Sequence, residues 1–179
     1  AQRLLPRGRA LRLERQVCRH DIAVHGEGTC TGGDTVDEFL ETVTREAASV
    51  RSISSRHRQR LTADVFEVRL PASGGVAVAV ESAWRLLNEG QPSQITPFFE
   101  VSLLGEWRPR LPASVAAVRD TDRLAGATGR VGLKIRCGGL EADAIPEVEA
   151  VAAAIATCRA TDVPLKATQG LHHPFRHHD

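Results

Sequence analysis

The chain of 179 residues contains no methionine and no tyrosine, and it has a single asparagine, Asn88. Lysine is almost as rare, because the 23 basic residues comprise 21 arginines and two lysines, Lys134 and Lys166. An arginine-rich chain that is poor in lysine and asparagine is typical of GC-rich coding sequence. Arginine stays protonated, whereas lysine can lose its proton and act as a base or nucleophile. The two lysines are therefore candidates for a chemical role that arginine cannot fill.

Long apolar runs and excess charge are also missing from the sequence. No run approaches the roughly 20 residues of a membrane span. With 23 basic and 22 acidic residues the net charge is +1, which gives no reason to expect nucleic acid as a partner. The four cysteines form no CxxC pair, and no secretory signal is present. We therefore expect a cytoplasmic globular protein that is not bound to a membrane.

The N-terminal region differs in composition from the rest of the chain. Residues 1–20 contain six arginines and one acidic residue, so we expect an irregular, arginine-rich arm over residues 1–34. From residue 35 onward, apolar residues recur at helical spacing up to Ile53. This pattern predicts one amphipathic helix over 35–58, capped by Asp34 or Thr35. Residues 35–179 are interpreted as a single β/α-barrel-like domain.

A short segment recurs four times, with starts roughly 32–34 residues apart. In each copy an apolar residue, a charged residue and another apolar residue are followed by Arg, Ser or Thr. Helix-like stretches separate the copies, and this alternation of strand and helix indicates parallel βαβ units. The four predicted strands are 65–70, 98–103, 132–137 and 164–169, and the helices between them are 76–87, 114–122 and 148–161.

The predicted strands have one polar face. Glu67, Glu100, Lys134 and Lys166 stand at the same position of each copy, and side chains at i and i+2 share a face. An open parallel sheet is apolar on both faces, whereas the inner face of a barrel reaches the active site. We therefore expect an α/β fold, namely a partial (β/α) barrel of about four parallel βα units preceded by a long amphipathic helix.

The length is too short for a closed barrel, which takes roughly 250 residues. Both ends of the sequence are abrupt, so we expect part of the barrel to lie outside it. The alternative is that two half-barrels pair, which would make the protein a homo-oligomer.

The two lysines are the strongest candidates for catalysis, because they lie on consecutive strands. A neighbouring cation or a dry pocket activates a lysine, which can then form a Schiff base with a carbonyl substrate. Glu67 and Glu100 could relay protons or hold a divalent metal ion, and His172 could act as an acid or base at a strand end. In the alternative interpretation the two glutamates and two lysines are structural ion pairs that fill the barrel.

A second group of residues is predicted to bind the substrate. Arg69, Arg136 and Thr168 follow the charged strand positions by two residues and share their face. Glycines come directly after the two lysine-bearing strands, where backbone amides could approach an anion such as phosphate. These glycines are Gly138, Gly139 and Gly170.

The segment from Lys166 to Pro174 resembles a K-A-T-x-G-L-H-H-P string of an uncharacterised bacterial β/α-barrel family. The likeness extends back to Lys134 and covers roughly the last 50 residues. The K-A-T-x-G and K-x-x-x-G-G elements are also similar to those of class I aldolases of the deoxyribose-phosphate type, although in the reverse order. The second resemblance implies a barrel with lysines on two neighbouring strands and a Schiff-base role for one of them.

Three hypotheses follow for the function. The first is a barrel enzyme that acts on a small carbonyl or phosphorylated substrate by lysine-based, lyase- or aldolase-like chemistry, without a cofactor. The second is a metal-dependent hydrolase or enolase-like enzyme that uses Glu67, Glu100 and His172. The third is a non-catalytic assembly or interaction module that binds through the arginine-rich arm.

Overall fold

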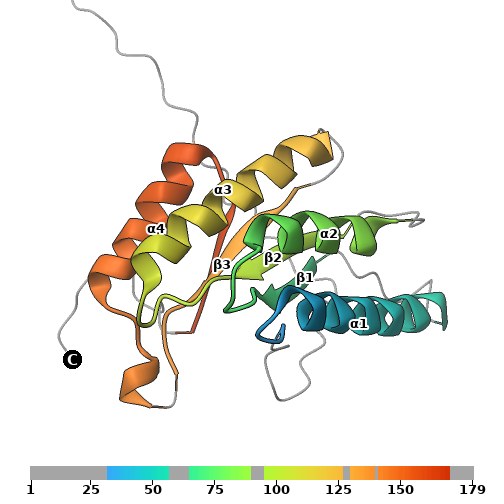
Figure 1. The fold of residues 1–179 in the computed structure, drawn as a ribbon, viewed down its shortest axis with the longest axis horizontal. Helices are drawn as coiled ribbons and strands as arrows, with labels where there is room; N and C mark the ends of the chain where they lie inside the picture. The colour runs from blue at the N-terminus through green and yellow to red at the C-terminus, as the bar shows by residue number, and fades with distance from the viewer. Residues whose placement is uncertain (1–31, 57–64, 90–94, 127–129, 140, 170–179) are drawn as a thin grey trace, which may run out of the picture.

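The computed structural model of this chain describes residues 32–56, 65–89, 95–126, 130–139 and 141–169. Helices and strands alternate throughout these ranges (Figure 1). The helices are α1 (Val36–Arg56), α2 (Val76–Asn88), α3 (Trp107–Ala125) and α4 (Val148–Thr161), and a short 3₁₀ helix spans Ala142–Ala144. The strands are β1 (Val65–Arg69), β2 (Thr96–Glu100), β3 (Gly132–Arg136) and β4 (Leu165–Thr168). None of the described helices is both long and apolar enough to cross a membrane.

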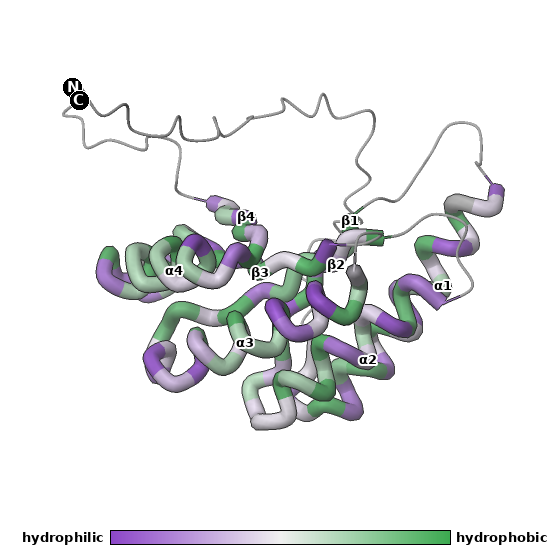
Figure 2. Tube along the Cα trace, turned by 90° about the horizontal axis from the view of Figure 1, so that it is seen from above, coloured by the Kyte–Doolittle hydropathy of each residue, from purple (hydrophilic) through white to green (hydrophobic). Residues whose placement is uncertain are grey.

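The four strands form one parallel sheet in the order β1-β2-β3-β4. Each strand therefore pairs with the next strand along the chain, and no reversal of order occurs. The four helices lie on one side of the sheet (Figure 2). This arrangement confirms the predicted α/β fold of about four βα units with a helix in front of them.

Helix α1 begins with a capping box. The Thr35 hydroxyl accepts a hydrogen bond from the backbone N–H of Glu38, at 3.3 Å, and the Glu38 carboxylate accepts one from the backbone N–H of Thr35, at 3.1 Å. Backbone hydrogen bonds from Thr35 and Asp34 lower the pKa of Glu38. Thr35 is thus the N-cap of α1. It is one of the two capping residues, Asp34 or Thr35, that the sequence predicted. The predicted arm ends directly before this cap, and its residues 1–31 lie outside the part of the chain that the structure describes.

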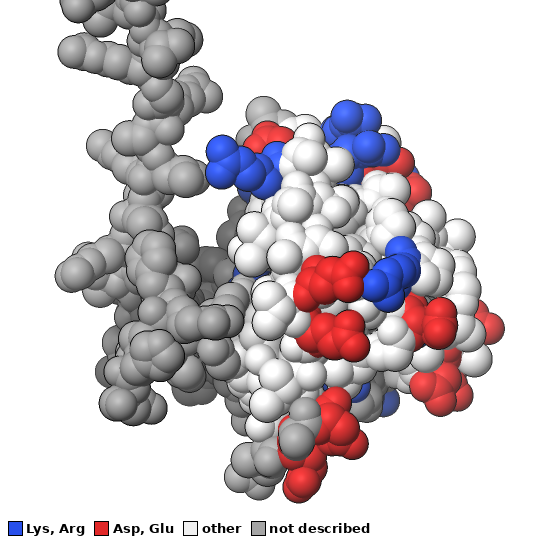
Figure 3. All heavy atoms as spheres, turned by 90° about the vertical axis from the view of Figure 1, so that its left-hand side faces the viewer, with Lys and Arg blue, Asp and Glu red and all other residues white. Residues whose placement is uncertain are grey.

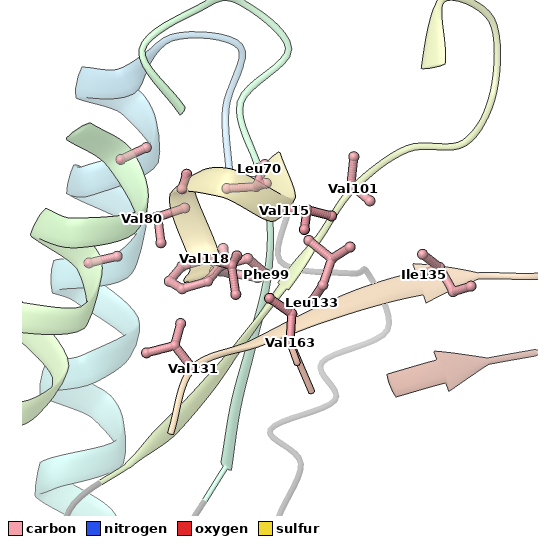
Figure 4. Close-up of a cluster of buried hydrophobic side chains, with 14 of the residues drawn as sticks. Leu70, Val80, Phe99, Val101, Val115, Val118, Val131, Leu133, Ile135 and Val163 are labelled. Atoms are coloured by element: carbon pink, nitrogen blue, oxygen red, sulfur yellow. The ribbon is translucent and has the colours of Figure 1, made fainter. Parts of the chain in front are cut away.

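The core lies between the sheet and the four helices. Strand residues of alternate parity point into it, and Figure 4 shows this cluster around Phe99 and Leu133. Phe99 is fully buried in the second strand, and its ring centroid lies 6.5 Å from that of Phe39 on α1. Cys158 of α4 is also buried, and burial raises its thiol pKa to about 11. Cys158 therefore serves as a small core residue.

Two elements begin at least two residues away from their predicted start. Helix α3 begins at Trp107, seven residues before the predicted start at Ser114, and so includes residues that were expected to form a loop. Pro112 lies inside this helix, and proline normally indicates a helix boundary. The buried side chains of Trp107 and Leu111 bind the first turns to the core and so outweigh the lost backbone hydrogen bond. Strand β2 begins at Thr96, two residues before its predicted start.

The chain's one asparagine connects α2 to β2. The Asn88 side-chain oxygen accepts a hydrogen bond from the backbone N–H of Ile95, at 2.8 Å, and its amide donates to the Ile95 carbonyl, at 3.2 Å. The same amide donates to the Trp84 carbonyl within α2. Asn88 therefore satisfies both backbone groups of the residue that leads into β2, where the chain enters the sheet.

Candidate active site

The face of the sheet that points away from the helices carries a row of charged side chains. Arg69, Glu100, Lys134 and Lys166 are successive partners in the registers of β1–β2, β2–β3 and β3–β4. Glu67 lies two residues before Arg69, and its partner in β2 is Phe98. The sequence repeat places Glu67 level with Glu100, and the structure corrects this alignment by two residues. A shift by an even number of residues keeps Glu67 on the same face.

Lys134 lies at the centre of the charged group. Its Nζ is 2.8 Å from Oε2 of Glu67 and 3.0 Å from Oε2 of Glu100. The side chain of Lys134 is 7% exposed and that of Glu100 is 2% exposed. Buried charges are tolerated when they are paired in this way. Lys134 therefore fixes the positions of two carboxylates, which corresponds to the structural interpretation of the ion pairs.

Lys166 has a different environment, because β4 is the last described strand at that edge of the sheet. Its Nζ lies 2.5 Å from Oε1 of Glu67, and its side chain is 41% exposed. The same ammonium group lies 5.9 Å from the centre of the Phe98 ring. The two lysines thus bind opposite oxygens of one carboxylate, but Lys166 is the one that a substrate can reach.

The arginines complete the group from the carboxyl ends of the strands. Nε of Arg69 donates to Oε1 of Glu100 at 3.1 Å, and a guanidinium nitrogen of Arg136 lies 3.6 Å from Oε2 of the same carboxylate. Thr168 is the register partner of Arg136. The structure therefore brings Glu67, Glu100, both lysines, both arginines and Thr168 onto one face of the sheet.

The remaining predicted residues have other positions. Gly138 and Gly139 follow β3, and a Cβ atom at Gly139 would lie 2.4 Å from Cβ of Ala144. Close packing against the 3₁₀ helix therefore requires a glycine at position 139, whatever its role toward a ligand. Gly170 and His172 lie outside the described residues.

Phe98 is a site residue that the sequence analysis missed. Its half-buried ring lies on the polar face, over Gly132. A Cβ atom at Gly132 would come within 2.4 Å of this ring. Phe98 lies two residues before Glu100 and therefore shares its face of the strand. This spacing is the sequence signal from which Phe98 could have been predicted as a site residue. The aromatic ring gives the site an apolar floor beside Lys166.

Both carboxylates are held in the ionised form. Burial acts to raise the pKa of Glu67 and of Glu100, but hydrogen bonds and charges outweigh it and lower both values. For Glu67 the cations are Lys134 and Lys166. For Glu100 they are Lys134, Arg136 and Arg69. At neutral pH the glutamates therefore act as hydrogen-bond acceptors and counter-ions.

Acid is expected to weaken the fold through these carboxylates. A carboxyl whose pKa is lowered in the folded state stabilises it above the unfolded value, about 4.3, and this contribution is lost as the pH falls through the folded value. Between about pH 5 and pH 3, the unfolding free energy of Glu67→Gln should therefore fall less steeply than that of the wild type. Urea titrations across this range measure both slopes. Glu81→Gln, which alters an exposed pair with Arg85, serves as the control. Equal slopes for wild type and Glu67→Gln would contradict the prediction.

A metal site is not formed by the described residues. No group of three or more His, Cys, Asp or Glu side chains is gathered within them. The oxygens of Glu67 and Glu100 face ammonium and guanidinium groups instead. The metal-dependent hypothesis, which also needs His172, stays untested.

Comparisons with known proteins return no match, since no family model fits the chain and no curated protein or solved structure is similar to it. The class of protein rests on the fold and the charged face: a partial parallel α/β sheet that presents lysines, arginines and carboxylates on one side.

Proposed function

We propose that this protein is a cytoplasmic enzyme that forms a Schiff base with a small carbonyl substrate through Lys166, in lyase- or aldolase-like chemistry. The observation that carries the proposal is the contrast between the two lysines. Lys134 is buried between two carboxylates, whereas Lys166 is exposed and has one carboxylate oxygen 2.5 Å from its Nζ. Glu67 is the base beside this accessible amine, and the Lys134 ammonium on its other oxygen is the kind of neighbouring cation that nucleophilic lysines use.

Glu67 is the residue that can move the protons of this reaction. Its Oε1 accepts a proton from the Lys166 ammonium group, and the neutral amine adds to the carbonyl carbon to give an alkoxide and a protonated nitrogen. Glu67 donates its proton to the alkoxide oxygen and takes one from the nitrogen, which gives the neutral carbinolamine. It then donates that proton to the hydroxyl, which leaves as water while the iminium forms. The net reaction converts an ammonium and a carbonyl into an iminium and water, and it leaves the glutamate ionised. The iminium retains the positive charge, so the pairing with Glu67 persists.

Lys134 and Phe98 are positioning residues in this scheme. Lys134 binds Oε2 of Glu67 at 2.8 Å and so directs Oε1 toward Lys166. The Phe98 ring below the Lys166 ammonium group excludes water from one side of it. Once formed, the iminium withdraws electrons from the bond next to the former carbonyl carbon, which is how a lysine enzyme breaks or makes a carbon–carbon bond.

Borohydride trapping tests this function. The full chain is incubated with aldehydes and α-keto acids, such as glycolaldehyde and pyruvate, and reduced with sodium borohydride. Mass spectrometry of the digest then locates the secondary amine that forms. We expect the adduct on Lys166. The yield of adduct should fall at least tenfold in Lys166→Met, because no other exposed lysine is available to replace Lys166. In Lys134→Met the adduct should still form on Lys166, but more slowly, because Glu67 loses the partner that orients it.

The chain simplifies the control for this experiment. With two lysines in the sequence, the labelled positions to be separated are Lys134, Lys166 and the N-terminal amine. Protein unfolded in urea gives the background reactivity of each. The proposal fails if the folded protein yields no borohydride-dependent adduct with the whole panel, or labels Lys166 no faster than the unfolded chain does.

A further inference from the structure

Among the described residues, the charged face carries more positive than negative charge. Two carboxylates, Glu67 and Glu100, are surrounded by Lys134, Lys166, Arg69 and Arg136. These six side chains hold two positive charges in excess. Because both carboxylates are ionised, the excess persists at neutral pH.

The excess is concentrated at the carboxyl ends of the strands. Arg69 is the last residue of β1 and Arg136 is the last residue of β3, and their guanidinium groups approach different oxygens of Glu100. Their side chains are 40% and 29% exposed, so both are accessible from this end. A half-buried cation is less hydrated than a cation in bulk water, and it therefore binds an anion more strongly.

Two residues of β4 lie next to Arg136. Thr168 is its register partner, and the Thr168 hydroxyl donates to the backbone carbonyl of Ile135 at 3.5 Å. Lys166 lies two residues before Thr168 on the same face of β4. Guanidinium groups bind carboxylates and phosphates through paired, charge-assisted hydrogen bonds. An oxyanion at this end would lie toward the carboxyl ends of the strands from the amine of Lys166, which contacts Glu67 and Phe98.

We infer that the carboxyl end of the charged face binds an oxyanion, a phosphate or carboxylate group, between Arg69 and Arg136. In the Schiff-base reaction this oxyanion is part of the carbonyl substrate, an inference that rests on the proposed function. The arginines hold the anionic end of the substrate, and its carbonyl carbon faces Lys166. The substrate class is then a short aldehyde or ketone that carries a phosphate or carboxylate group.

The binding test uses the full-length chain and two simple anions, inorganic phosphate and malonate. Isothermal titration in low-salt buffer measures the dissociation constant of each, and the tighter of the two identifies the anionic group. We expect the dissociation constant to rise at least tenfold in Arg136→Gln and in Arg69→Gln. Arg85→Gln is the matched control, because Arg85 forms an exposed pair with Glu81 on α2, away from the charged face. No binding by the wild type, or equal weakening in Arg85→Gln, would overturn the inference.

A second measurement covers the case in which an arginine variant does not fold. Phenylglyoxal modifies accessible arginines of the wild-type protein, and mass spectrometry of the digest shows which ones the bound anion protects. Phosphate or malonate should protect Arg69 and Arg136 and leave Arg85 reactive. Protection of other arginines instead would contradict the site.

The two proposals can fail separately. If neutral glycolaldehyde is trapped on Lys166 while neither anion binds, the Schiff-base function stands and the oxyanion site does not. If an anion binds between the arginines and no carbonyl compound is trapped, the site stands as a binding site and the Schiff-base function fails. Trapping that is at least tenfold more efficient with a phosphorylated or carboxylated aldehyde than with its neutral analogue supports both.

Discussion

Replacing Glu100 with leucine is expected to lower the free energy of unfolding by about 3–5 kcal/mol. The Glu100 carboxylate is 2% exposed and lies 3.0 Å from Nζ of Lys134. It also pairs with Arg69 and Arg136. Leucine fills similar space but has no charge, so the three cations then face one another. Within the group, the carboxylate that remains to neutralise them is that of Glu67. Equilibrium urea unfolding of the wild type and the variant measures the loss.

A double-mutant cycle separates this charge effect from packing. Lys134→Met removes the most buried cation, so Glu100→Leu/Lys134→Met should be less destabilised than the sum of the single variants by more than about 1 kcal/mol. Glu81→Leu removes an exposed partner of Arg85 and should cost less than about 0.5 kcal/mol. A Glu100→Leu variant that loses no more than Glu81→Leu would show that the charged group contributes nothing to stability.

Replacing Phe99 with alanine is expected to cost a similar amount for a different reason. Phe99 is fully buried in β2 and points into the core between the sheet and the helices (Figure 4). Its ring centroid lies 6.5 Å from that of Phe39 on α1. Truncation of a buried phenylalanine removes its transfer free energy and leaves a cavity, with a total of about 3–5 kcal/mol. Thermal or urea unfolding of Phe99→Ala should show this loss without a change in the urea dependence of the unfolding free energy.

The neighbouring residue provides the control. Phe98 has the same side chain one position earlier, but it lies half-buried on the charged face beside Lys166. Phe98→Ala should cost less than half as much stability as Phe99→Ala, and it should slow the trapping of carbonyl compounds on Lys166. Equal losses of stability would mean that the two faces of the sheet are packed alike.

The periodicity of the sequence was sufficient to predict the two faces of the sheet. Alternation in 65–70, 98–103 and 132–137 separates core residues from charged residues, and that division depends on parity alone. The fourth helix was predicted with the observed bounds, Val148–Thr161, because its apolar spacing is unbroken. Helix α3 was shortened in the prediction by Pro112, since the packing of Trp107 is a tertiary contact that the local sequence does not contain.

The charged residues of the site could be selected from the sequence, but their roles could not. Lys134 and Lys166 have the same place in their repeats, so the sequence treats them as equivalent. Their difference arises from position in the sheet, because Lys134 lies on an inner strand and Lys166 on the last described one. In the structure β1 is shifted by two residues relative to β2, compared with the alignment of the repeats, and both lysines form ion pairs with Glu67. This shift depends on strand register and is not encoded in the spacing of the repeats.

One face of the molecule shows how the charges outside the site are distributed. In Figure 3 the surface on the α4 side carries separated acidic and basic groups on a largely uncharged background. Arg108 of α3 pairs with Glu149 of α4 at 2.9 Å, with both side chains about two-thirds exposed. Exposed pairs of this kind contribute little to stability, about 0–1 kcal/mol. Removing one partner from the buried charges on the other side of the sheet is therefore expected to change stability far more.

The order of the strands also bears on how the chain reaches its native state. Each described strand pairs with the next one along the chain, and the register partners are 31–34 residues apart. No strand has to wait for a distant segment, so the sheet can grow one unit at a time from β1 to β4 while the polypeptide is being synthesised. The charged cluster follows the same order. Arg69 and Glu100 meet first, Lys134 joins the two carboxylates when β3 arrives, and Lys166 is the last of these residues to reach its place. The exposed amine of Lys166 is thus added to a counter-ion arrangement that the earlier units have already built.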